Sequence, residues 1–166
     1  MGMVCNFLRV TNDELEEYLN DSSKLDDRLD QEFEMEESNV VDIDKSWEGI
    51  LFLLTGQNAE NLDHPLSKFL FSGQIIDEDQ DLGYGPGHYL KPDQVKKINS
   101  EIAMLSTEDL KARYDPAKMD SLNIYPTGWT KNGDGLLDYL LEYFETVKQI
   151  YSTASAKNEA LITFLN

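Results

Sequence analysis

The sequence predicts an α/β fold of the α+β kind, in which a small mixed sheet is packed between helical layers. Strand-like segments stand at both ends of the chain, at residues 3–10 and 160–166, and segments with helical spacing of apolar residues lie between them. Strands separated by helices bury the faces of their sheet against those helices. No internal repeat or low-complexity linker divides the chain, and 166 residues are enough for one core. We therefore expect residues 1–166 to form a single compact domain.

The first elements are predicted from side-chain type and from a helix-start signal. Residues 3–10 (MVCNFLRV) are rich in side chains that favour strands. Thr11, with Glu14 three positions later, is typical of a capping box, so a helix is expected to begin there.

Residues 21–38 are strongly acidic and leave two interpretations open. Leu25, Leu29 and Phe33 recur every four residues, a spacing that fits a surface helix with one narrow apolar stripe. The density of carboxylates fits a mobile acidic loop instead. The sequence does not decide between them, but in either case this segment should be the most exposed and least stable part of the domain.

A buried helix is predicted within residues 40–56 (VVDIDKSWEGILFLLTG). Its apolar residues recur at helical spacing and cover nearly the whole circumference. Asp42 or Asp44 should cap its start, and Gly56 should end it in the left-handed conformation.

The rest of the chain alternates short elements and turns. A short helix is expected at 65–71, short strands at 73–76 and 88–90, and a helix from Pro92. Ser106 and Asp109 form a second capping box, and residues 114–129, which contain two prolines, predict turns. A long helix at about 136–156 and the apolar strand ALITFLN complete the prediction.

The charge of the chain limits its partners. The formal net charge is −18, from 32 acidic and 14 basic residues. Such a surface repels nucleic-acid phosphates and anionic lipids, so neither nucleic acid nor membrane is expected as a partner. Two interpretations remain: the charge keeps the protein soluble, or it accelerates the encounter with a basic protein partner.

The compartment is predicted from what the sequence lacks. No run of eighteen apolar residues exists, and the N-terminal residues lack the basic start and long apolar region of a signal peptide. A single cysteine, Cys5, permits no internal disulfide. We therefore expect a cytoplasmic protein, in which Cys5 is an unreactive residue of the first strand.

The stretch LGYGPGHYLKPDQV, residues 82–95, is the first candidate site. Its Gly-Pro-Gly sequence predicts a tight turn that feeds the strand at 88–90, and its glycine spacing does not match a nucleotide-binding turn. Tyr84, His88 and Tyr89 would be presented beside this turn, where binding residues often concentrate. His88 and His64 are the only histidines and so the first candidates for proton transfer, although a lone histidine is more often structural.

The second candidate is the helix start that contains Asp44, Lys45 and Trp47. A cation in the first helical turn opposes the helix dipole, so Lys45 is expected to pair with a carboxylate. The group can serve as a structural network or as part of a binding site. We predict that these three residues lie close to the loop 83–90, and that Trp47 is buried.

No recognisable motif supports a metal, a cofactor or a reaction. The alternating aspartates at 77, 79 and 81 and the pair Asn132 and Asp134 resemble calcium loops, but both lack the glutamate at position twelve. No nucleophile elbow, Cys-x-x-Cys pair or zinc-binding helix is present. The sequence therefore predicts no metal site and no cofactor, and it identifies no enzyme activity.

Taken together, several stretches resemble the YfbM-like family of bacterial proteins, a domain of unknown function. The resemblance rests on MGM at the start, residues 42–56, residues 65–74, the loop 82–95, NIYPTGW at 123–129, and the terminal helix with its apolar tail. It implies a single α/β domain with a sheet between helical layers, and no catalytic residue. Members often carry Arg where His88 stands, so proton transfer by His88 is not expected to be a mechanism of the whole family.

Two classes of function remain. The first is an acidic interaction protein, of inhibitor or immunity type, that binds a basic partner. The second is a small-molecule binder or enzyme with a pocket between Tyr84–Tyr89 and Asp44–Trp47. A pocket that joins these two stretches would favour the second class, and an acidic face without such a pocket would favour the first.

Overall fold

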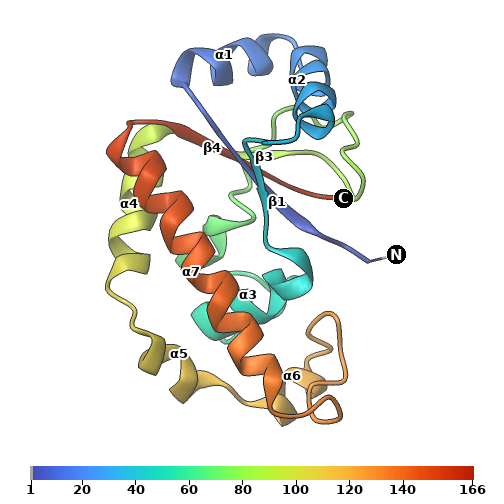
Figure 1. Cartoon of the computed structure of the whole chain (residues 1–166), viewed down its shortest axis with the longest axis vertical. Coiled ribbons are helices and arrows are strands. Elements are labelled where there is room, and N and C mark those ends of the chain that lie inside the picture. Colours follow the sequence, from blue (N-terminus) through green and yellow to red (C-terminus); the bar gives the residue numbers. More distant parts are fainter. Residues whose placement is uncertain (1) are drawn as a thin grey trace.

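The computed structural model describes residues 2–166, and its helices are stacked on both faces of a four-stranded sheet (Figure 1). One helical layer consists of α1 (Asn12–Asn20) and α2 (Ser23–Glu34). The other layer is built around the three helices α3 (Trp47–Thr55), α4 (Pro92–Ala103) and α7 (Gly135–Ala156). The predicted fold class, with a sheet between helical layers, is confirmed.

The sheet has the order β2-β1-β4-β3 and brings the two ends of the chain together at its centre. Its strands are β1 (Cys5–Val10), β2 (Val40–Asp42), β3 (His88–Leu90) and β4 (Ala160–Leu165). The terminal strands pair along their full length, from Cys5 opposite Leu165 to Val10 opposite Ala160.

The expectation of a mixed sheet was wrong, because every strand pairing within residues 2–166 is antiparallel. The reason lies in the connection between β1 and β2. A single crossover helix returns the chain to the start of a strand and gives a parallel neighbour. Here α1 and α2 together leave and rejoin the same end of β1, and Val40 pairs with Leu8 near that end. The strand β2 must then run in the opposite direction.

Side chains along the strands point alternately to the two faces of the sheet, and this alternation divides the interior into two cores. Phe7 and Leu161 face α3, α4 and α7, whereas Leu8 and Ile162 face α1 and α2. Successive side chains of a strand point to opposite faces, so both faces of this sheet are covered by apolar side chains. The sheet therefore holds the acidic N-terminal helices against the rest of the molecule.

Two predicted helix starts and one helix end are confirmed. The Thr11 hydroxyl accepts a hydrogen bond from the Glu14 amide at 3.1 Å at the start of α1. In α5 (Thr107–Arg113), Ser106 and Asp109 bond to each other's backbone amides. Gly56 ends α3 with a φ of 72°, a conformation that costs little only for glycine.

The undecided segment 21–38 contains the helix α2. Leu25 and Leu29 are buried beneath it, as the stripe predicts. Phe33 is 54% exposed, so the stripe ends one turn earlier than its spacing indicates.

Residues 40–56 do not form one helix. Val40 to Asp42 pair with β1 as a strand, a 3-10 turn η1 (Asp44–Ser46) follows, and α3 begins only at Trp47. The Asp42 carboxylate accepts a hydrogen bond from the Asp44 amide at 3.0 Å, and the N-cap residue of α3, Ser46, makes no side-chain cap. Neither predicted aspartate therefore caps α3. The β-branched pair Val40–Val41 favours pairing in the sheet over helix.

Two further expectations are corrected. Residues 114–129 contain a helix, α6 (Pro116–Ser121), because Asp115 accepts from the Lys118 amide at 3.1 Å and proline suits a first helical turn. Residues 73–76 form only one bridge, between Ile75 and His88. The short helix expected at 65–71 is the 3-10 helix η2 (Pro65–Phe69).

Candidate functional site

An aromatic row links the two sequence candidates Trp47 and His88. The Phe71 ring lies edge-on to both, with centroids 5.8 Å from Trp47 and 5.5 Å from His88. On its other side Trp47 stacks on Tyr125 at 5.6 Å, and its indole N–H donates to the Met3 carbonyl at 3.1 Å. Trp47 and His88 of the 83–90 loop therefore share a neighbour in Phe71, a residue that the sequence did not single out.

The His88 side chain is half-buried, and one of its two ring nitrogens accepts a hydrogen bond. Its Nδ1 accepts a hydrogen bond from the Gly73 amide at 3.3 Å, which leaves Nε2 to carry the proton of the neutral ring. Burial lowers the pKa of His88, so the neutral form predominates at pH 7. The ring is available as a weak donor, and within residues 2–166 no carboxylate contacts it to orient it as a catalytic base.

The space beside His88 is small. A cavity of about 50 Å³ is lined by residues of β1, β4 and the loop, among them Cys5, Tyr84 and His88. Binding sites for small molecules usually measure several hundred Å³, so this cavity has room for little more than a water molecule. Burial raises the pKa of the Cys5 thiol well above its usual range, which keeps the sulfur protonated and unreactive.

Of the remaining candidates, Lys45 approaches the Tyr125 end of this row, whereas Asp44 and Tyr89 make contacts elsewhere. Asp44 accepts a hydrogen bond from the Tyr139 hydroxyl of α7 at 2.9 Å. Lys45 lies beside Gly2, where an added Cβ would overlap the Lys45 side chain, and within residues 2–166 it forms no ion pair. The expected carboxylate partner of Lys45 is therefore not found. Tyr89 packs on the opposite face of the sheet, against the core under α1 and α2.

The glycines of the loop have a structural explanation. Gly83 adopts a φ of 134°, and a Cβ at that position would lie 2.7 Å from the Asn166 backbone. The Asp81 carboxylate accepts from the amides of Gly83 and Gly85, at 2.9 and 3.1 Å. The Tyr84 amide then donates to the Leu165 carbonyl at 3.0 Å, which fastens the turn to the end of β4.

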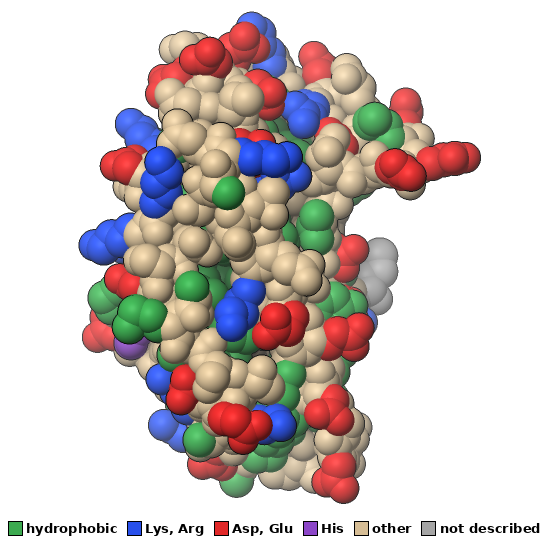
Figure 2. All heavy atoms as spheres, turned by 60° about the vertical axis from the view of Figure 1, so that its left-hand side comes forward, with side chains coloured by type: hydrophobic (Ala, Val, Ile, Leu, Met, Phe, Trp, Pro, Cys, Tyr) green, Lys and Arg blue, Asp and Glu red, His purple; other side chains and the backbone are tan. Residues whose placement is uncertain are grey.

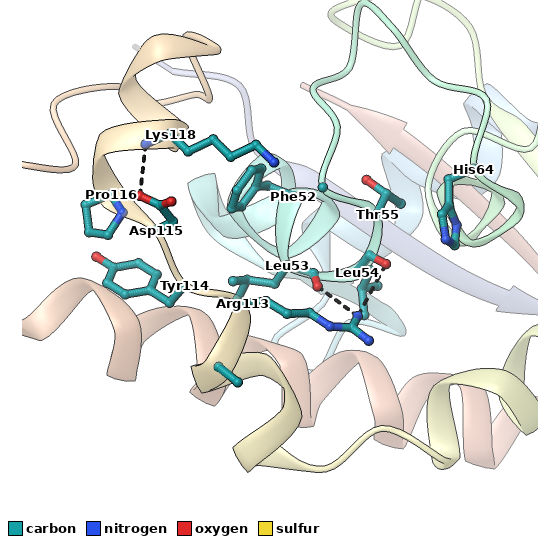
Figure 3. A pocket seen from close by; sticks show the side chains of 12 residues that line it. Phe52, Leu53, Leu54, Thr55, His64, Arg113, Tyr114, Asp115, Pro116 and Lys118 are labelled. Atoms are coloured by element: carbon teal, nitrogen blue, oxygen red, sulfur yellow. Dashed lines mark hydrogen bonds between the residues drawn. The ribbon is translucent and has the colours of Figure 1, made fainter.

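A larger cleft lies at the C-terminal end of α3, and no sequence signal predicted it (Figure 3). Its volume is about 630 Å³, and residues of α3, α5 and α6 surround it together with His64. The Arg113 guanidinium donates to the carbonyls of Leu53 and Leu54, at 3.1 and 3.5 Å, and the Lys118 ammonium lies 5.7 Å from the Phe52 ring centre. Arg113 thereby supplies hydrogen bonds to the last carbonyls of α3 and places a positive charge at the negative end of the helix dipole. These two interactions are a sufficient structural reason for its position.

The most pronounced electrostatic feature is an acidic cap, which we define as residues 12–37 and 77–81. These segments carry 16 acidic and 2 basic side chains, a net charge of −14, while the remainder of the chain carries 16 acidic and 12 basic ones. Figure 2 shows acidic side chains over the upper part of the molecule, where α1 and α2 lie, and along its right-hand outline, although other acidic side chains lie over the lower half. Most of the net charge therefore lies on one side of the sheet.

Specific bonds join the two segments of the acidic cap. The Ser22 hydroxyl donates to Asp77 at 2.6 Å, and the Gln80 amide donates to the Ser22 carbonyl at 3.1 Å and to Asp26 at 3.0 Å. Residues that are 54 to 58 positions apart in the sequence thus form one continuous surface. Most carboxylates of this surface remain exposed to solvent.

One cation and one buried carboxylate organise the inner side of the cap. Arg28 donates to Glu14 at 3.0 Å and to Glu32 at 2.8 Å. Glu32 is buried and also accepts from the Asn39 amide at 2.6 Å. Burial alone would raise the pKa of Glu32, but the bonds from Asn39 and Arg28 outweigh burial and lower it to about 2.

Residues 2–166 contain no group of three or more His, Cys, Asp or Glu side chains placed to hold a metal ion. Over the same range, no helix combines the length and the apolar character that crossing a membrane requires.

A family model for DUF1877, a domain of unknown function, matches residues 1–164. The chain belongs to the DUF1877 family. The solved structure of YfbM from Escherichia coli, a protein of unknown function, has the same fold as this DUF1877 chain, with a TM-score of 0.76. The alignment covers 98% of this chain and 99% of that one at 17% sequence identity. None of the curated proteins compared matches the chain. At this identity the likeness establishes the fold of the DUF1877 chain, and its function has to be argued from the side chains.

Proposed function

We propose that this protein is an interaction domain that binds a basic protein partner through the acidic cap. The observation that carries the proposal is the segregation of charge: −14 of the net charge of −18 belongs to the acidic cap. A charge needed only for solubility has no reason to gather on one side of the sheet. A one-sided field, by contrast, steers a partner of opposite charge to that side.

The acidic cap also offers apolar contact area. Phe33 at 54% and Met35 at 53% are among the few large apolar side chains that are exposed, and both lie within its acidic surroundings. Interfaces draw most of their affinity from a few apolar or aromatic side chains, while charges at the rim mainly increase the association rate. An inhibitor or immunity protein that occludes a basic surface would combine these two features.

The small-molecule alternative receives less support from the geometry. Trp47 and His88 share a neighbour in Phe71, but the cavity at the loop measures about 50 Å³ and none of Asp44, Lys45 and Trp47 lines it. The two stretches therefore frame no pocket of the size that a metabolite requires.

Capture from the native host at low and high salt tests the proposal. The baits are the native protein, a cap variant (Asp26→Asn, Asp27→Asn, Asp30→Asn, Glu34→Gln) and a matched control (Glu60→Gln, Asp138→Asn, Glu142→Gln, Glu145→Gln). Both variants lose four exposed carboxylates and have the same net charge, but only the first loses them from the cap. We expect a basic protein, identified by mass spectrometry, on the native and control baits and its depletion from the cap variant. Equal recovery on all three baits would contradict the proposal.

A further inference from the structure

We propose that the outer edge of β2 is the docking site for an extended basic segment, which adds a fifth strand to the sheet. This inference rests on the proposed function and specifies how the partner would bind. Strand addition at a free sheet edge is a common mode of peptide recognition, in which backbone hydrogen bonds provide affinity and flanking side chains provide specificity.

The hydrogen-bond pattern identifies which backbone groups of β2 point outward. Ile43 donates to the Cys5 carbonyl at 2.9 Å, and Asp42 lies opposite Asn6 in the register. In an antiparallel ladder the residues next to such a bonded pair direct their N–H and C=O groups away from the partner strand. The amide and carbonyl of Asp42 and the carbonyl of Val40 therefore face away from β1, and within residues 2–166 they have no hydrogen-bond partner.

The opposite edge of the sheet is already closed. Along β3, the Tyr89 amide donates to the Gln74 carbonyl at 2.9 Å, and the Ile76 amide donates to the Gly87 carbonyl at 2.9 Å. The Gln74 side chain also bonds to the Tyr89 carbonyl, at 2.9 Å. Residues 74–76 thus occupy the place of a neighbouring strand there, and β2 is the edge left for an added strand.

Side chains around β2 select a basic occupant. The exposed residues Glu34, Glu36 and Glu37, at the end of the acidic cap, lead directly into β2. The Asp42 carboxylate is exposed on the strand itself, and Val41 is 36% exposed beside it. An incoming strand with alternating Lys or Arg would meet these carboxylates and could place apolar side chains over Val41.

The same charges disfavour a second copy of this chain as the occupant. Two β2 edges brought together would align like charges, a device by which sheet proteins prevent edge-to-edge pairing. Because β2 has only three residues, few backbone hydrogen bonds are available, so the added strand needs the carboxylates for affinity as well.

The test uses two synthetic probes of equal charge. One is a blocked hexapeptide of alternating lysine and valine, and the other is the same peptide N-methylated at its four central residues, which removes their backbone donors. Amide resonances of the isotope-labelled full chain are followed by NMR during titration at low ionic strength. We expect saturable shifts of the Val40 and Asp42 resonances with the first peptide. The dissociation constant of the second peptide should be at least tenfold larger.

Two variants at position 42 test the contribution of the outward backbone N–H of Asp42 to peptide binding. Asp42→Ala removes the carboxylate, and Asp42→Pro removes in addition the outward N–H, so the proline variant should bind the unmodified peptide several-fold more weakly than the alanine variant.

Three outcomes would overturn the inference: equal affinities for the two peptides, no saturable binding of the unmodified peptide, or shifts at Asp42 that depend on protein concentration alone, which would indicate pairing of two copies. None of these outcomes would by itself reject the acidic cap as a partner surface, because the capture experiment judges that proposal separately.

Discussion

Two buried carboxylates show how single residues in this acidic protein serve the fold. Glu32 accepts from the Asn39 amide, and Glu48, on α3, accepts from the amides of Ala59 and Tyr125 at 2.7 and 2.6 Å. Each carboxylate ties a loop to a helix through backbone donors. Neither was predicted as a buried residue, because glutamates in an acidic sequence are normally solvated and nothing local marks these two.

Replacement of Glu32 by Gln should lower the free energy of unfolding at pH 7 by about 1–3 kcal/mol, because a buried charge-assisted network loses its anion. The folded-state pKa, about 2, lies below the ordinary value of 4.5, so folding favours the ionised form. The stabilisation is therefore complete above about pH 5 and is lost as the pH falls toward 2. Denaturant unfolding of both proteins across this range measures it, and a difference that does not change with pH would contradict the assignment.

A second prediction at the residue scale concerns the contribution of Trp47 to stability. Its ring is 3% exposed and packs between Phe71 and Tyr125, so Trp47→Ala should destabilise the protein by about 3–5 kcal/mol. Trp47→Phe, which keeps an aromatic ring, should restore part of this loss. The melting temperature of each variant measures the effect. An unchanged melting temperature for Trp47→Ala would indicate that the ring acts in recognition instead of packing.

Among the elements, α2 separates side chains that stabilise the fold from those available to a partner. Leu29 is 5% exposed and Phe33, one turn later, is 54% exposed. The helix is amphipathic over two turns only, and Arg28 holds it to α1 through Glu14.

We expect Leu29→Ala to cost about 2–5 kcal/mol of unfolding free energy and Phe33→Ala less than about 0.5 kcal/mol. The two variants remove similar apolar groups from the same helix, so each is the control for the other. Binding of the captured partner should respond in the opposite order, with Phe33→Ala weakening it. If Phe33→Ala proved as destabilising as Leu29→Ala, Phe33 would be a packing residue and would lose its role as a contact.

The elements that the sequence predicted best are those with local signals. Thr11, Ser106 and Gly56 mark helix ends through bonds and backbone conformations that involve near neighbours only. The predictions failed where a distant partner decides the structure. Residues 40–42 form a strand because β1 lies beside them, and α6 forms where two prolines indicated turns because Pro116 occupies a first helical turn, where proline is tolerated.

At the scale of the whole molecule, the acidic segment 21–38 is evident from the sequence, but the surface that it forms with residues 77–81 is not. The acidic cap depends on contacts of Ser22 and Gln80 with residues 54 and 55 positions away in the sequence. The contact of Trp47 and His88 with Phe71 was anticipated only in part, since Phe71 carries no signal of its own. The cleft at Arg113 was not anticipated at all, because it is assembled from three separate segments.

The association rate of the captured basic partner, measured against ionic strength, tests the acidic cap most directly. For the cap variant at low salt we predict a rate at least tenfold below that of the native protein, because four carboxylates of the steering surface are gone. The matched control with four carboxylates removed elsewhere should stay close to the native rate, and all three rates should converge at high salt. If the cap variant and the matched control associate equally fast at low salt, the position of the charge is irrelevant to binding, and the proposed function is wrong.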